Sequence, residues 1–234
     1  LRSLALALSF IQNDYVSNDG NSGLWNMNFR IASTHDLKIN TYVDERRDPY
    51  KSTYALVKYL NELYSIYEDW YLVLAAYASS PSDVNIAARK NGMSKNYWAL
   101  QNDLPENAQS IIPKFIAATY VMNYYKEHGI KPSSTIERVT IDSVSIKKWV
   151  HFDQVAEKLG VNIELLRFYN PKFRKDIVPY SPNYYQLALP QSLKSKFALL
   201  DELSFKPYAM DFTDTDTEEP SMPIDTIQKN QDSL

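Results

Sequence analysis

The sequence predicts a mainly α-helical domain followed by a small α+β module, and three observations support this prediction. In residues 1–130, apolar residues recur with the 3.6-residue period of helices. Residues 131–137, which contain Pro and Ser, then have the composition of a linker. In residues 138–200, patterns typical of strand, helix, helix and strand follow one another within about 50 residues, the order of a compact α+β module.

The helices of the first region can be placed from capping residues and apolar spacing. Ser52 or Thr53 is expected to cap a helix. One face of that helix carries apolar residues at helical spacing: Leu56, Leu60, Leu63 and Tyr67. The dense apolar run of residues 70–78 predicts a helix that is buried on most sides. Residues 81–92 and 105–129 each predict a further helix, closed by a glycine near its end.

The second region is expected to open with an extended segment around residues 139–144. Residues 152–159 repeat apolar side chains at helical spacing and stop at Gly160, and residues 163–169 predict a second short helix. Alternating apolar residues at positions 185–189 predict the closing strand.

The last segment, residues 201–234, is acidic. The part from Asp211 onward is rich in carboxylates and contains a single basic residue, Lys229. Such a composition predicts a disordered, solvated tail.

The composition argues against several classes of function. The chain has 25 Lys and Arg against 28 Asp and Glu, so no basic surplus indicates a nucleic-acid partner. Cysteine is absent and the three histidines lack the spacing of a helical zinc site, so we expect no metal and no cofactor. No apolar run reaches the roughly 20 residues of a membrane helix. No signal peptide opens the chain, which is therefore expected to be a mature or truncated form.

Four motifs in the first region carry a family resemblance. In order along the chain, they are SGLW at 22–25, NTYVDERRDPYKST at 40–53, LAAY at 74–77 and PKFIAA at 113–118. Their order and spacing resemble those of membrane-bound lytic transglycosylases with a goose-lysozyme-like SLT domain, in the variant of the Bacteroidetes lineage. The resemblance covers roughly residues 4–130. It implies a lysozyme-like helical fold, peptidoglycan glycan strands as partner, and a periplasmic or outer-membrane-associated location.

The second region resembles a divergent LysM repeat, on residues 151–161, 164–166 and the pair Asn170-Pro171. The resemblance implies binding of glycans that contain N-acetylglucosamine. The apolar residues of these segments are expected to form helix core, which leaves Asn170 and its neighbours as candidates for sugar contact.

The resemblance also shows which residue is missing. The family cleaves its substrate with one glutamic acid, which first donates a proton and then accepts one. This Glu opens a Glu-Ser pair, and an ungapped count back from Gly23 places it at Leu8, followed by Ser9. An alignment on the apolar run of the first helix places it at Phe10 instead, and both alternatives stay open. No Glu precedes Glu45 in the chain, so we expect no catalytic residue and an inactive enzyme.

The residues that support the acid in the family have changed as well. The family's Gln, Asn, Glu and Tyr are replaced here by Asn26, Ala78, Asn107 and Ile111. Asp14 and Asp19 are the candidates for a replacement acid, although a loop aspartate is usually ionised at neutral pH. Trp25 and Tyr77 are candidates for stacking on sugar rings. The intact segment Asp44–Thr53 is expected to maintain the fold, as a charged turn that feeds a capped helix.

Three functions remain in competition. The first is a catalytically inactive transglycosylase-like protein of the bacterial envelope that binds peptidoglycan glycan strands. The second is a docking scaffold for envelope proteins in a periplasmic or outer-membrane complex. The third is an active lytic transglycosylase with a displaced acid. The sequence favours the first two over the third and does not rank them, because binding and docking grooves both need a maintained shape.

Overall fold

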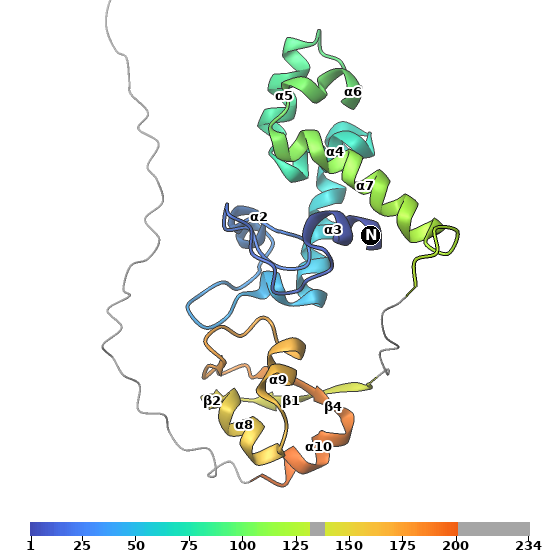
Figure 1. Ribbon diagram of the computed structural model, residues 1–234. Helices are drawn as coiled ribbons and strands as arrows, with labels where there is room; N and C mark the ends of the chain where they lie inside the picture. Colours follow the sequence, from blue (N-terminus) through green and yellow to red (C-terminus); the bar gives the residue numbers. More distant parts are fainter. Residues whose placement is uncertain (132–138, 201–234) are drawn as a thin grey trace, which may run out of the picture.

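The computed structural model describes residues 1–131 and 139–200 (Figure 1). Within these residues, a helical part precedes a smaller α+β part, which confirms the predicted fold class. The expected linker at residues 131–137 lies outside the described residues except for Lys131, and so does the expected acidic tail at residues 201–234.

The helical part runs from the N-terminus to α7, the green helix that lies diagonally in Figure 1. Its elements are α1 (Arg2–Ser9), α2 (Phe29–Thr34), the 3₁₀ helix η1 (Glu45–Arg47), α3 (Pro49–Tyr67), α4 (Trp70–Ala78), α5 (Pro81–Lys90), α6 (Tyr97–Leu100), the 3₁₀ helix η2 (Gln101–Asp103) and α7 (Glu106–Tyr124). The prediction that α4 is buried on most sides is confirmed, because six consecutive residues, 72–77, are buried. Helix α4 packs against α3, α5 and α7, and α1 packs along α7.

Two helix boundaries differ from the prediction. Helix α3 begins at Pro49, because the side chain of Asp48 accepts hydrogen bonds from the first-turn N–H groups of Tyr50 and Lys51. The expected cap at Ser52 or Thr53 is therefore wrong, and both residues lie inside the helix. Helix α7 ends at Tyr124, and the residues up to 129 form turns rather than a further helical turn.

The α+β part contains β1 (Ile141–Ile146), β2 (Val150–His151), α8 (Phe152–Leu159), α9 (Ile163–Tyr169), β3 (Ile177–Val178), β4 (Tyr185–Pro190) and α10 (Gln191–Ala198). The outer strands pair antiparallel, with Ile141 opposite Pro190 and Ile146 opposite Tyr185. Strands β2 and β3 form a second antiparallel pair. The predicted order of strand, helix, helix and strand is thus confirmed, and α10 is an additional helix that the sequence analysis did not predict.

The segment before α3 connects the two parts. Val43 forms an antiparallel bridge with Phe173 and is fully buried in the core of the α+β part. The N–H of Asp44 donates to the carbonyl oxygen of Lys172 at 2.8 Å, and the N–H of Arg174 donates to that of Tyr42 at 2.8 Å. The α+β part accordingly lies against the loops at the start of α3, at the opposite end of the helical part from α5 and α6 (Figure 1). The intact Asp44–Thr53 segment thus both begins α3 and helps to attach the α+β part.

Candidate functional site

A cleft of about 830 Å³ lies between α1, the loop that follows it, the end of α4 and one face of α7 from Asn107 to Val121. One wall is apolar and comes mainly from α1 and α7: Leu6, Ala7, Leu8, Ile111, Ala117, Ala118 and Val121. A second part of the lining is polar and comes mainly from the loop after α1, with three residues of α7: Ser17, Asn18, Asp19, Asn21, Asn26, Asn28, Asn107, Ser110 and Lys114. An elongated ligand with apolar faces and polar edges would match both parts of the lining.

The end of α1 is tied to the SGLW segment by one side chain. Ser9 is fully buried, and its hydroxyl donates to the carbonyl oxygen of Leu24 at 2.6 Å. Leu8, the residue before it, is half-buried, packs against the core of the helical part and lines the cleft. Phe10 also lines the cleft but is 72% exposed, with a left-handed φ of 55° at the end of the helix. Both candidate positions for the family's Glu therefore line the cleft, and Leu8 is the one that directly precedes the buried Ser9.

The four remaining positions singled out from the sequence all line the same cleft: Asn26, Ala78, Asn107 and Ile111. Asn26 has a left-handed φ of 47°. Its Oδ1 is shielded from solvent and accepts no hydrogen bond from any residue that the structure describes. The amide of Asn26 therefore has hydrogen-bonding capacity that the described part of the chain does not use.

Trp25 and Tyr77 are both buried, and only Tyr77 lines the cleft. Trp25 is 4% exposed, does not line the cleft, and donates from Nε1 to Oγ1 of Thr53 at 2.9 Å. This differs from the expectation that its ring stacks on a sugar, since both faces are packed in the core. Tyr77 does line the cleft, but it is buried and its hydroxyl donates to the carbonyl oxygen of Trp25 at 2.7 Å. Burial raises the pKa of the Tyr77 hydroxyl far above its usual value, so this group stays protonated.

Two aspartates are the only acidic side chains that line the cleft among the described residues: Asp19 and Asp83. Asp14, the other candidate for a replacement acid, lines a different hollow. Asp83 was missed in the sequence as a cleft acid; it lies in the first turn of α5, the helix that follows α4 and its LAAY motif. The hydroxyl of Ser80 donates to Oδ2 of Asp83 at 2.6 Å.

Comparison with known families identifies both parts of the chain. Residues 1–100 match the family model of the transglycosylase SLT domain, and residues 140–204 match that of the lytic transglycosylase MltD, LysM-like domain. The chain carries an SLT domain followed by an MltD-type LysM-like domain. It is similar to the membrane-bound lytic murein transglycosylase D of Escherichia coli strain K12, with 28% identity over 153 residues. The protein of the same description from Escherichia coli O6:H1 has the same identity over the same length.

The match covers 64% of this chain and 33% of each relative, so the chain spans about a third of the length of the curated relatives it matches. The two parts of this chain are thus similar, in the same order, to a transglycosylase SLT domain and to the LysM-like domain of a lytic transglycosylase. No helix in the described ranges is long and apolar enough to cross a membrane.

In the LysM-like domain, Asn170 has a structural role. It is buried, and its Nδ2 donates to the carbonyl oxygens of Leu166 at 3.0 Å and Ala188 at 2.8 Å. Its Oδ1 accepts the N–H of Ala188 at 2.7 Å. These bonds fasten the end of α9 to β4 and occupy both polar atoms of the amide. The geometry thus differs from the expectation that Asn170 contacts a sugar.

Proposed function

We propose that this protein binds glycan strands of peptidoglycan in the cleft of its SLT domain without cleaving them. The observation that carries the proposal is the combination of a retained cleft with Leu8 in the position before the buried Ser9. The relation to envelope transglycosylases supports a location in the periplasm or at the outer membrane.

The cleft has the properties of a binding site. Its volume of about 830 Å³ falls in the range of roughly 300–1,000 Å³ that is usual for ligand sites. Apolar side chains of α1 and α7 could contact the faces of sugar rings. Amide and hydroxyl side chains of the cleft could form hydrogen bonds with the hydroxyl groups at the edges of the rings. Asn26 adds an acceptor that has no partner among the described residues.

The same cleft lacks the means for the reaction. Leu8 has no group that can donate or accept a proton, and general acid–base catalysis typically contributes about 10²–10⁴ in rate. Asp19 lies in an exposed loop, and Asp83 is bound to Ser80 through Oδ2. Asp19 is exposed and Asp83 is half-buried, so neither side chain is fully enclosed by the protein.

Two assays on the intact chain test the proposal. Purified peptidoglycan should sediment the protein, and prolonged incubation should release no anhydro-muropeptides. The variant Ala117→Trp, which fills the cleft from an exposed position on α7, should abolish sedimentation. Ala99→Trp on α6 is the matched control, because Ala99 is also exposed but lies outside the cleft.

Anhydro products from the wild-type protein would contradict the inactive reading and make Asp19 and Asp83 the first acids to replace. Sedimentation that survives Ala117→Trp would show that the glycan is not held in this cleft.

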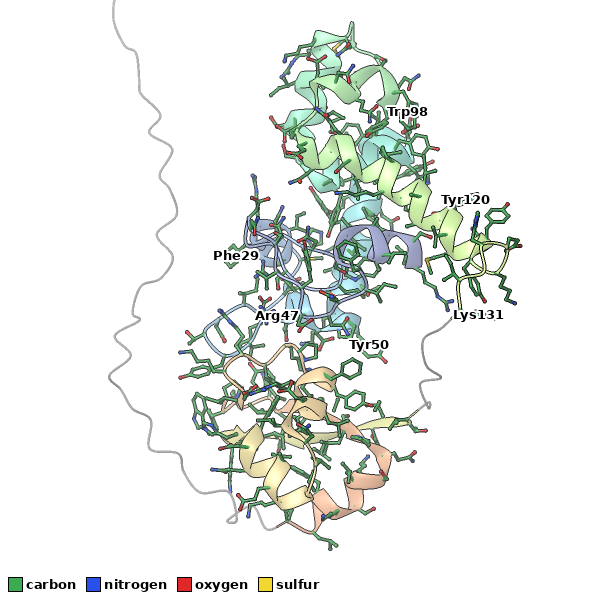
Figure 2. The ribbon with its side chains drawn as sticks, in the orientation of Figure 1. Phe29, Arg47, Tyr50, Trp98, Tyr120 and Lys131 are labelled. Atoms are coloured by element: carbon green, nitrogen blue, oxygen red, sulfur yellow. The ribbon has the colours of Figure 1, made fainter. Side chains whose placement is uncertain are left out.

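A docking scaffold is the second candidate, and one observation favours it. Helix α3 carries aromatic side chains on an outward face, with Tyr50 at 87%, Tyr54 at 79% and Tyr64 at 39% exposure. Trp70 stacks on Tyr64 with a distance of 4.7 Å between ring centroids, and Figure 2 marks Tyr50 at the start of the helix. Aromatic residues are enriched at protein interfaces. If the protein neither sediments with peptidoglycan nor releases anhydro-muropeptides, the docking scaffold remains as the candidate. Cross-linking to envelope proteins would then test it, and the Tyr54→Ser variant should lose the cross-linked partner.

A further inference from the structure

A second hollow, of about 430 Å³, lies where the SLT domain meets the LysM-like domain. The SLT domain contributes Asp14 and Arg47 to it. The LysM-like domain contributes the loop after α9 and one residue of that helix, with Arg167, Phe173, Arg174, Lys175 and Asp176 among them. Figure 2 shows Arg47 at this junction. The hollow is separate from the cleft, with which it shares no lining residue.

The basic side chains of this hollow are not equally neutralised. Arg167 is paired with Asp176, with Nη2 and Oδ2 2.5 Å apart, and also with Glu164. By contrast, Arg47 and Arg174 form no ion pair with any carboxylate in the described ranges.

Arg47 is held by its inner nitrogen only. Its Nε donates to Oγ of Ser22 at 3.0 Å, and its two terminal nitrogens donate to no residue that the structure describes. The pKa of Arg47 is lowered, first by burial of the guanidinium and further by the positive charge of Arg174, against the opposing charges of Asp44 and Asp14. Two guanidinium groups thus repel each other across a half-buried space.

The guanidinium group of Arg174 also has hydrogen-bond donors that the described residues do not use. Its Nη1 donates to the carbonyl oxygen of Asn40 at 3.3 Å, which ties it to the SLT domain. Its other nitrogens make no bond within the described part of the chain, and the side chain is exposed. The backbone of the next two residues, Lys175 and Asp176, is left-handed with φ of 56° at both, a conformation that non-glycine residues rarely adopt.

We propose that this hollow binds a carboxylate, held by the guanidinium groups of Arg47 and Arg174. The planar fork of arginine matches the two oxygens of a carboxylate, and charge-assisted bonds of this kind are roughly twice as strong as neutral ones. The anion would remove the repulsion between the two arginines. It would also bridge the two domains, because one arginine comes from each.

The carboxylates of peptidoglycan stem peptides are the source that the location favours, and this part of the inference rests on the proposed function. Asp14 lines the hollow and Tyr15 lines the cleft. Their Cα atoms are about 3.8 Å apart as chain neighbours, so the loop after α1 forms a thin wall between the two sites. A glycan strand bound in the cleft would thus have the hollow within reach of the peptides attached to it.

The test uses the intact chain and a free stem tetrapeptide, with the same peptide fully amidated and with inorganic phosphate as the other probes. Binding is followed by calorimetry and by backbone amide shifts in NMR spectra. We expect the free acid to bind and to shift the amides of residues 173–176, and the amidated peptide to leave them unchanged. Arg174→Gln should weaken binding of the free acid about tenfold, the effect of losing one charge-assisted hydrogen bond.

Arg89→Gln is the matched control, since Arg89 is an exposed arginine on α5 outside both sites. Equal binding of the free and amidated peptides, no binding of the free acid, or unchanged affinity in Arg174→Gln would overturn the proposal. Phosphate that binds with the same affinity as the peptide would show a general oxyanion site and overturn the assignment to stem peptides. The tetrapeptide contains no sugar, so these outcomes do not depend on glycan binding in the cleft, which Ala117→Trp tests separately.

Discussion

Asp48 of the SLT domain and Lys172 of the LysM-like domain form a largely shielded ion pair, in which Oδ2 and Nζ lie 2.9 Å apart. The other carboxylate oxygen of Asp48 accepts the N–H groups of Tyr50 and Lys51. One side chain therefore both begins α3 and fastens the LysM-like domain. This double role gives the Asp44–Thr53 segment a structural function in both domains.

Replacement of this aspartate should affect both domains at once. Asp48→Asn keeps a capping oxygen but leaves Lys172 without its carboxylate, and we expect a loss of about 1–3 kcal/mol in the free energy of unfolding. Urea unfolding followed by a tryptophan signal in each domain measures it: Trp25 reports on the SLT domain and Trp149 on the LysM-like domain. A loss confined to Trp25 would contradict the role of the pair between domains.

The same pair predicts a dependence of stability on pH. Burial disfavours the charged form of Asp48, but the charge and hydrogen bond of Lys172, with the N–H groups of Lys51 and Tyr50, outweigh burial and lower its pKa. A lowered folded-state pKa contributes stability that is fully present above the unfolded value and is lost as the pH falls through the folded value. The difference in unfolding free energy between wild type and Asp48→Asn should therefore be constant above about pH 5 and shrink below about pH 4. A difference that stays constant down to pH 2 would contradict this assignment.

Val43 tests how far the LysM-like core depends on the SLT domain. It is fully buried in that core although it precedes α3 in the chain. Val43→Ala removes two methyl groups and leaves a cavity, so we expect about 2 kcal/mol of destabilisation, visible in the Trp149 signal. Val57→Ala on α3 is the matched control, because Val57 is 39% exposed and should change stability by less than about 0.5 kcal/mol.

The sequence predicted the parts of the fold that local patterns determine. Apolar residues placed α3, α4, α8 and α9, because α3 and α8 each bury one face at helical spacing and α4 is a dense apolar run buried on most sides. The apolar spacing placed the start of α3 too late, because the capping residue Asp48 and the first helical residue Pro49 do not belong to the apolar pattern. It gave no sign of the bridge between Val43 and Phe173, because pairing between segments that are distant in sequence depends on tertiary packing.

The site divides in the same way. Leu8, Asn26 and Ala78, which were singled out from motif spacing, line one cleft in the structure, and their role there stays a prediction. Motif spacing could not predict the directions in which the side chains point. The indole N–H of Trp25 points inward to Thr53. Both polar atoms of the Asn170 side chain form hydrogen bonds with the backbone of Ala188, and the spacing of residues in the sequence reveals neither contact.

Gly23 of the SGLW motif should be the least tolerant glycine of the SLT domain. Its φ is 81°, and an added Cβ would lie 1.9 Å from the carbonyl oxygen of Arg46. In Gly23→Ala, the new Cβ is strained by the left-handed backbone and clashes with the main chain. We therefore expect the free energy of unfolding, measured by thermal unfolding, to fall by about 3 kcal/mol or more. Gly20→Ala is the control: its φ is 74° but no atom lies within 4 Å of the added Cβ, so a cost of about 1 kcal/mol is expected. Equal losses in the two variants would show that the close approach to Arg46 is unimportant.

Restoring the acid alone should not restore the reaction. In Leu8→Glu, the new carboxyl group would lie on the cleft wall, but Asn26, Ala78, Asn107 and Ile111 would still stand where the family has its supporting groups. Catalytic groups act as a unit rather than additively, so we expect no anhydro-muropeptides from this variant within the detection limit of mass spectrometry. Leu8→Gln, similar in size and without an acid, controls for disturbance of the wall, and sedimentation with peptidoglycan checks that both variants still bind. Anhydro products from Leu8→Glu but not from Leu8→Gln would show that this one position accounts for the inactivity and that the remaining cleft is still organised for catalysis.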